Sequence, residues 1–179
     1  MNAGTLILDS GEHFRKMSYR NRYRISGANN SILLSIPLVN GRNQHSQMKE
    51  VLIHNEERWQ VQHWRTLVSV YKRSPYFDHY EESLRPLFET SYAYLIDFNR
   101  DSIEWVGKQL KLRFEIREAD GFVIDYPAGD VDLRNVKQPV SLLPEYHQVF
   151  EDRIGFLADL SILDMLFSEG PHCVEQLKS

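Results

Sequence analysis

The sequence contains a single cysteine, Cys173, so no disulfide can form within the chain. A small secreted fold stapled by disulfides is excluded, and a reducing compartment is expected. No apolar run approaches the ~20 residues that span a bilayer. The first residues also lack the basic-then-apolar pattern of a signal peptide. We therefore expect a cytoplasmic protein without a membrane span.

Several motifs that carry chemistry are also missing. The sequence has no G-x-G-x-x-G, Walker A, H-E-x-x-H, G-x-S-x-G or C-x-x-C motif. The seven histidines are dispersed. His79 and Glu82 share a helix face at a spacing of three, but a single such pair offers too few ligands for a metal. We therefore predict no metal and no cofactor. Acidic residues outnumber basic ones by 25 to 21, which gives no reason to expect a nucleic-acid partner.

The residues that are present suit one folded domain. The chain has 179 residues, of which 42% are hydrophobic and 12% aromatic, enough for a sizeable core. Hydrophobic patterning predicts strands at Thr5–Leu8, Ile32–Ile36, Val51–Ile53, Phe114–Ile116 and Phe122–Tyr126. Helices are predicted within Arg58–Phe77, Ser91–Leu110, Tyr146–Phe150, Leu160–Phe167 and Cys173–Leu177. Tyr80–Phe88 is predicted as a short helix or turn interrupted by Pro86. The fold class is therefore α/β, with a small mixed sheet packed on long helices and a helical C-terminal part.

The stretch Arg58–Phe77 organises this fold. Trp59, His63, Leu67 and Tyr71 recur every four residues, which places them on one core-facing side of a helix. Gln62, Arg65, Thr66 and Lys72 fall on the outer side. Asn55 is the expected N-cap, and Ser74-Pro75 ends the helix because the residue before a proline is pushed out of the α region.

The basic and aromatic stretch Phe14–Arg24 is the strongest local indication of function. Its guanidinium groups suit a phosphate or carboxylate, because they bind such groups through paired donors. We predict that Lys16, Arg20 and Arg22 hold the anion and that Asn21 orients it. The alternative is a solvated strand or loop whose charges balance acids elsewhere.

Two further side chains belong to the predicted site. His63, set among aromatic residues, is the candidate general base, with its pKa lowered by burial. The alternative is a packed histidine that bonds to a backbone carbonyl. Tyr19 and Tyr71 are predicted to line the substrate site.

Several blocks of the sequence resemble the WbqC-like family. They are EHFRKMSYRNR at Glu12–Arg22, Leu34–Pro37, Trp59 with His63 and Tyr71, Ser74–Phe77, and the closing block Tyr146–Gly170. Members of this family occur in bacterial gene clusters for O-antigen and other surface polysaccharides. The resemblance implies a transferase of surface-polysaccharide biosynthesis, for which glycine or aminoacyl transfer to a sugar precursor has been suggested. The alternative is a non-catalytic binding or accessory protein of the same pathway.

The sequence departs from the family at its start. Family members usually carry a strand, a loop and a short helix before the segment equivalent to Leu6–Asp9, and no such segment precedes it in this sequence. Because Leu6, Ile7 and Leu8 read as a strand buried on both faces, we expect an open apolar edge there. Such an edge predicts self-association through the N-terminal strand.

Overall fold

The computed structural model describes residues 4–41, 45–119, 121–127, 129–134 and 145–177. These residues belong to two compact units, each with its own strands and helices. Unit 1 draws on Met1–Arg20, Leu38–His54 and Tyr92–Val140, and unit 2 on Asn21–Pro37, Asn55–Ser91 and Ser141–Ser179. The prediction of one domain over residues 1–179 stays a prediction.

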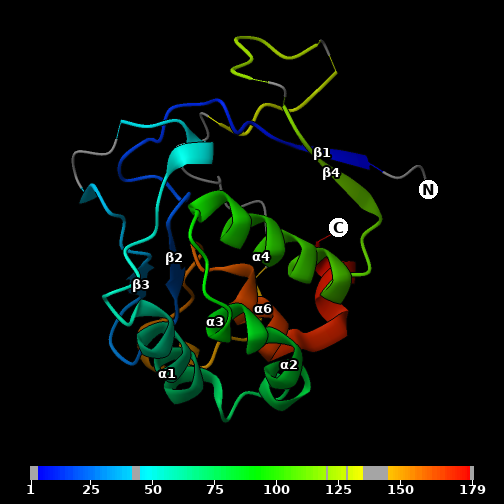
Figure 1. The fold of residues 1–179 in the computed structure, drawn as a ribbon. Helices are drawn as coiled ribbons and strands as arrows, with labels where there is room; N and C mark the ends of the chain where they lie inside the picture. The colour runs from blue at the N-terminus through cyan, green and yellow to red at the C-terminus, as the bar shows by residue number, and fades with distance from the viewer. Residues whose placement is uncertain (1–3, 42–44, 120, 128, 135–144, 178–179) are drawn as a thin grey trace. The chain divides into compact units, whose positions relative to one another are not determined.

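Unit 1 is built on a pair of parallel strands and one long helix. Its elements are β1 (Gly4–Leu8), the 3₁₀ helix η2 (Met48–Glu50), α4 (Leu95–Gln109) and β4 (Phe114–Glu118). β1 pairs with β4 (Figure 1). In this pairing Leu6 lies opposite Ile116. The helix approaches the Phe114 ring so closely that a Cβ on Gly107 would lie 2.5 Å from it. A larger residue at this position would force helix and strand apart.

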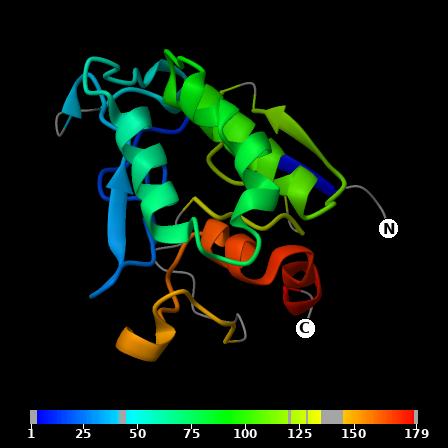
Figure 2. The same ribbon diagram turned by 90° about the horizontal axis from the view of Figure 1, so that it is seen from below.

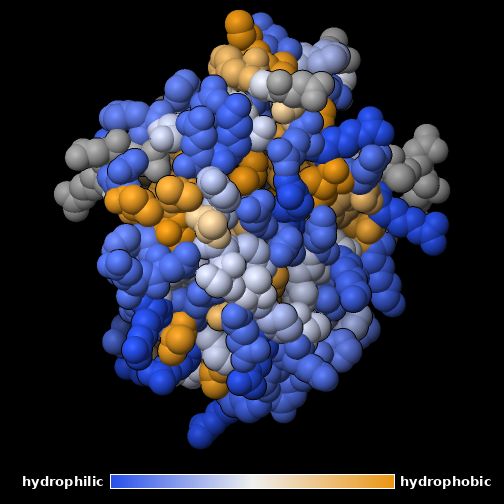
Figure 3. All heavy atoms as spheres, in the orientation of Figure 1, coloured by the Kyte–Doolittle hydropathy of each residue, from blue (hydrophilic) through white to orange (hydrophobic). Residues whose placement is uncertain are grey.

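The outer surface of unit 1 carries unusual apolar exposure. In β1, Ile7 is 41% exposed and Leu6 and Leu8 are half-buried, so part of the strand's apolar surface is exposed. Phe122, Ile124, Val131 and Leu133 are also largely exposed. Figure 3 shows apolar side chains interrupting an otherwise mostly hydrophilic face.

Unit 2 combines an antiparallel hairpin with a helical core. The hairpin consists of β2 (Arg22–Ile25) and β3 (Ile32–Ser35), and the helix α1 (Trp59–Tyr71) lies beside it (Figures 1 and 2). The other elements are α2 (Phe77–Leu84), α3 (Pro86–Glu89), α5 (Glu151–Ile154), α6 (Ile162–Glu169), η3 (Gly170–His172) and α7 (Cys173–Gln176).

An aromatic cluster fills the core of unit 2. The Phe167 ring of α6 lies 4.9 Å from the Tyr71 ring and 5.0 Å from the Phe77 ring, centre to centre. These distances are in the favourable range for aromatic pairs. Trp64 on the edge of α1 contacts Phe77 and Phe88. The cluster therefore joins α1, α2, α3 and α6 through ring contacts.

The α/β class and the helical C-terminal part are confirmed. The strands form two separate two-stranded sheets, one parallel and one antiparallel. Val51–Ile53 makes only isolated bridges, and β2 was not predicted as a definite strand. No strand forms at Phe122–Tyr126, and no helix forms at Tyr146–Phe150, so both predictions were wrong.

The start of α1 also differs from expectation. The helix begins at Trp59 after Arg58, and no side chain caps it. The amide oxygen of Asn55 accepts a hydrogen bond from the Trp59 indole nitrogen at 3.3 Å instead. Glu56 and Glu57 consequently precede the helix, and its first turn contains no acid.

Candidate functional site

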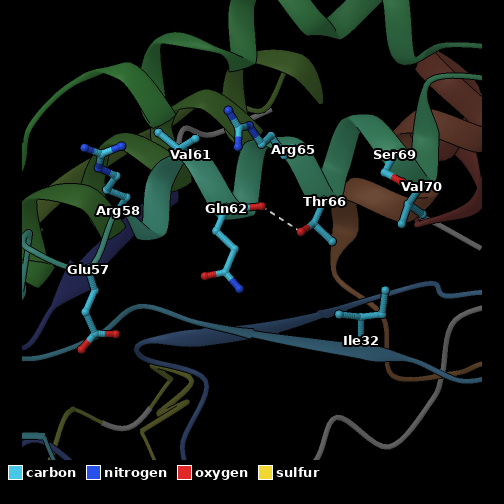
Figure 4. A pocket seen from close by; sticks show the side chains of 9 residues that line it. All are labelled: Ile32, Glu57, Arg58, Val61, Gln62, Arg65, Thr66, Ser69 and Val70. Atoms are coloured by element: carbon cyan, nitrogen blue, oxygen red, sulfur yellow. Dashed lines mark hydrogen bonds between the residues drawn. The ribbon is translucent and has the colours of Figure 1, made fainter.

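An open groove runs along the outer face of α1 in unit 2. We call it the α1 groove; its volume is about 630 Å³, within the range of small-molecule sites. One wall is α1 with the two residues before it, and Ile32 of β3 contributes the other side (Figure 4). It is lined by Ile32, Glu57, Arg58, Val61, Gln62, Arg65, Thr66, Ser69 and Val70.

The sequence of α1 explains why this face is free. Trp59, His63, Leu67 and Tyr71 are buried, as predicted, and they occupy one side of the helix. Because an α-helix turns once in 3.6 residues, the positions between them face away from the core. Gln62 and Arg65 are accordingly exposed. The four buried positions of α1 thereby determine which of its other side chains line the groove.

Two arginines give the groove its basic character. Within the described part of the chain, the guanidinium groups of Arg58 and Arg65 make no hydrogen bond or ion pair. Guanidinium groups bind phosphate and carboxylate through paired N–H donors. Gln62, Thr66 and Ser69 add uncharged polar groups along the same wall. This set can hold an anion and orient hydroxyl groups beside it.

His63 lies on the opposite side of α1 from the groove. Its side chain is 3% exposed, and its Nδ1 forms a 3.3 Å hydrogen bond with the Tyr23 hydroxyl of β2. The Trp59 ring packs edge-on against it. Burial lowers the pKa of His63 to about 4, against the opposing effect of a hydrogen bond to the Ser35 backbone. The residue is therefore neutral at pH 7 and links α1 to both strands of the hairpin.

Tyr71 belongs to a buried polar cluster. Its hydroxyl donates to Asp164 at 2.6 Å and accepts from the Ser26 backbone N–H at 2.9 Å. Tyr146 donates to the other Asp164 oxygen at 3.0 Å. Burial raises the pKa of Asp164, while the two tyrosine hydrogen bonds act in the opposite direction. Burial also raises the pKa of Tyr71, so its hydroxyl is a neutral donor that is already engaged.

The predicted anion-binding residues have different surroundings. Arg20 makes a bidentate ion pair with Glu12, at 2.7 and 2.6 Å, so its guanidinium already has a carboxylate partner. Asn21 donates its side-chain amide to the Ile36 backbone oxygen at 3.0 Å. Lys16 and Tyr19 are exposed. These residues are assigned to a site by prediction alone.

The seven predicted site residues are divided between the two units. Lys16, Tyr19 and Arg20 belong to unit 1, whereas Asn21, Arg22, His63 and Tyr71 belong to unit 2. Within unit 2, Arg22 is half-buried on β2, and His63 and Tyr71 are both on the core side of α1. None of the seven lines the α1 groove.

Unit 1 contains a second charged cluster that the sequence did not indicate. The Arg134 guanidinium contacts Asp9 at 2.6 Å, binds both oxygens of Asp132 and lies 4.8 Å from the centre of the Tyr126 ring. Its hydrogen bonds lower the pKa of Asp132 to about 2. Every charged group of the cluster has a charged partner within unit 1.

The described residues offer no group of three or more histidine, cysteine, aspartate or glutamate side chains that could hold a metal ion. None of the helices in the described ranges has both the length and the apolar character that a bilayer-spanning helix requires.

The molecule is thus an α/β protein with an open, partly basic groove along one helix. A family model, the WbqC-like protein family, matches residues 1–126. This match covers 126 of 179 residues, and the chain belongs to that family. Searches of curated proteins and of solved structures each gave no match.

Proposed function

We propose that this protein binds a phosphate- or carboxylate-bearing small molecule in the α1 groove and serves bacterial surface-polysaccharide biosynthesis. The observation that carries the proposal is the pair of guanidinium groups, Arg58 and Arg65, that line the groove without a partner among the described residues. Membership of the WbqC-like family, together with the resemblance to polysaccharide-cluster proteins, supports this choice of pathway. An accessory or binding role is the form of this function that the groove supports best.

Catalysis is the second candidate, because His63 is neutral at pH 7 and a neutral imidazole is what a general base requires. Glycine or aminoacyl transfer is the reaction that the family resemblance implies. Two features favour the binding role. His63 does not line the groove, and its ring nitrogens engage Tyr23 and the Ser35 backbone. A base must reach the proton that it removes, directly or through one water.

Thermal unfolding with two probes, inorganic phosphate and UDP-glucose, tests the proposal. Ligand at a hundred times its Kd stabilises the folded state by about 2.7 kcal/mol, or about 5 to 10 °C in Tm for a protein of this size. We expect the double variant Arg58→Ala, Arg65→Ala to lose this increase. Arg73→Ala is the matched control, because Arg73 is an exposed arginine just after α1 that does not line the groove.

The same measurement tests the basic stretch. If Arg20 and Arg22 hold the anion, the double variant Arg20→Ala, Arg22→Ala should lose the ligand-induced increase in Tm. The double variant Arg58→Ala, Arg65→Ala should then keep this increase. Because Arg20 also pairs with Glu12, its substitution changes the stability of the unliganded protein. The increase in Tm is therefore measured relative to the unliganded Tm of the same variant. An increase that survives in the Arg58, Arg65 variant, or no increase with either probe, would overturn the groove as the binding site.

A further inference from the structure

The α1 groove has two chemically different ends. Glu57 and Arg58 lie at one end, whereas Ile32 and Val70 lie at the other (Figure 4). The twelve steps from position 58 to position 70 extend about 18 Å along a helix that rises 1.5 Å per residue. A free phosphate ion occupies only a small part of that length.

The apolar end is formed by two β-branched side chains from different elements. Ile32 projects from β3 and Val70 from the last turn of α1, and both are half-buried. Thr66 and Ser69 separate this end from the arginines and carry no charge. Ile32 and Val70 leave apolar surface partly exposed to water. A ligand that covers this surface removes it from water, which makes binding more favourable.

The charged end favours one anionic group over several. Arg58 and Arg65 are seven residues apart, about two helical turns, so both long side chains can approach the same group between them. The Glu57 carboxylate lines the same end and repels additional negative charge. A polyanion such as nucleic acid would therefore be disfavoured.

From these two ends we infer that the ligand is an amphipathic anion, a phosphate monoester with an apolar chain. This inference rests on the proposed function. The phosphate pairs with Arg58 and Arg65, and the chain extends past Thr66 and Ser69 to contact Ile32 and Val70. Such a monoester is either a soluble small molecule or the headgroup region of a phosphorylated lipid.

Titration calorimetry with inorganic phosphate and with butyl, hexyl and octyl phosphate tests the inference. Each added methylene that enters the apolar end should tighten binding about fourfold, the factor that corresponds to about 0.8 kcal/mol. In Ile32→Thr with Val70→Thr, the gain per methylene, measured relative to inorganic phosphate with the same variant, should fall towards onefold. Leu33→Thr is the matched control, since Leu33 is an exposed β3 residue outside the groove.

The outcomes separate the two proposals. If phosphate binding requires Arg58 and Arg65 but the affinity does not depend on chain length, the inference is overturned and the proposed function stands. Absence of binding by every probe overturns both. A chain-length gain that persists unchanged in the Ile32, Val70 variant also overturns the inference. Where the gain is confirmed, co-sedimentation with phosphatidylcholine vesicles that contain phosphatidic acid assigns the ligand to a lipid, and its absence assigns it to a soluble ester.

Discussion

Acid sensitivity of the fold is a direct consequence of the buried His63. The side chain packs against Trp59 and bonds to Tyr23 and the Ser35 backbone, and burial lowers its pKa to about 4. An unfolded chain leaves the same imidazole in water, where its pKa is about 6.5. As the pH falls below 6.5, the unfolded chain therefore takes up a proton that the folded protein does not accept.

The size of the effect follows from these two pKa values. The difference between 6.5 and about 4, at about 1.4 kcal/mol per pH unit, corresponds to about 3 kcal/mol. This contribution to stability is complete above pH 6.5, decreases between pH 6.5 and pH 4, and is lost below that range. At pH 4.5 about 2.5 kcal/mol of it should already be gone.

The measurement is urea unfolding followed by tryptophan fluorescence at pH 7.5 and pH 4.5, in the parent protein and in His63→Gln. Glutamine retains a hydrogen-bond donor and an acceptor but does not titrate. Other groups also titrate in this range, and they contribute equally to both proteins. We expect the parent to lose about 2.5 kcal/mol more than the variant between the two pH values. Equal losses would refute the reasoning, since they would mean that folded His63 accepts a proton as readily as the unfolded chain does.

Two other predictions concern packing and association. Trp59 is 3% exposed, so Trp59→Ala should lower the free energy of unfolding by about 3 to 5 kcal/mol in urea melts, and a loss below about 1 kcal/mol would contradict its placement in the core. For self-association through β1, light scattering should show a concentration-dependent increase in mass. Ile7→Lys should reduce this increase while Leu112→Lys, outside the strands, should not, and a constant monomer mass in the parent would contradict it.

The core-facing side of α1 could be predicted because it depends only on local periodicity. Four large residues recur at a spacing of four, and a helix places such residues on one face whatever surrounds it. The helices α4 and α6 and the strands β1 and β4 were likewise predicted in place. β1 is a short apolar run next to turn residues, and β4 alternates apolar and charged residues.

The incorrect elements depend on side chains that replace backbone partners. At Phe122–Tyr126, the Arg134 guanidinium donates to the backbone oxygens of Val123 and Ile124, acceptors that a neighbouring strand would otherwise use. At Tyr146–Phe150, the Gln148 amide exchanges two hydrogen bonds with the backbone of Leu157, both 2.9 Å long. These contacts join residues nine to eleven positions apart, a separation that helix and strand periodicity does not report.

In the candidate site too, features that depend on local periodicity could be predicted, and features that depend on contacts between segments could not. Assigning Arg65 to the outer side of α1 followed from helical periodicity, and the structure confirms it. The groove also requires Ile32 of β3 beside α1, a contact between segments about thirty residues apart. For Arg20, the many basic residues around it in the sequence suggested that it binds an anionic ligand. In the structure its guanidinium instead pairs with the carboxylate of Glu12, eight residues earlier.

The two faces of α1 connect the stability of unit 2 with its proposed function. His63 on the core side bonds to β2 and β3, and Ile32 of the same β3 strand forms the other side of the α1 groove. A substitution at His63 can therefore weaken ligand binding through the position of β3, without any role for the imidazole in proton transfer. Lost transfer activity in a His63 variant would be expected from either role. The informative quantity is the affinity of His63→Gln for the anion at pH 7.5. If His63 only positions β3, the substitution decreases the affinity and any transfer rate together. If His63 is a general base, the substitution decreases the transfer rate and leaves the affinity unchanged.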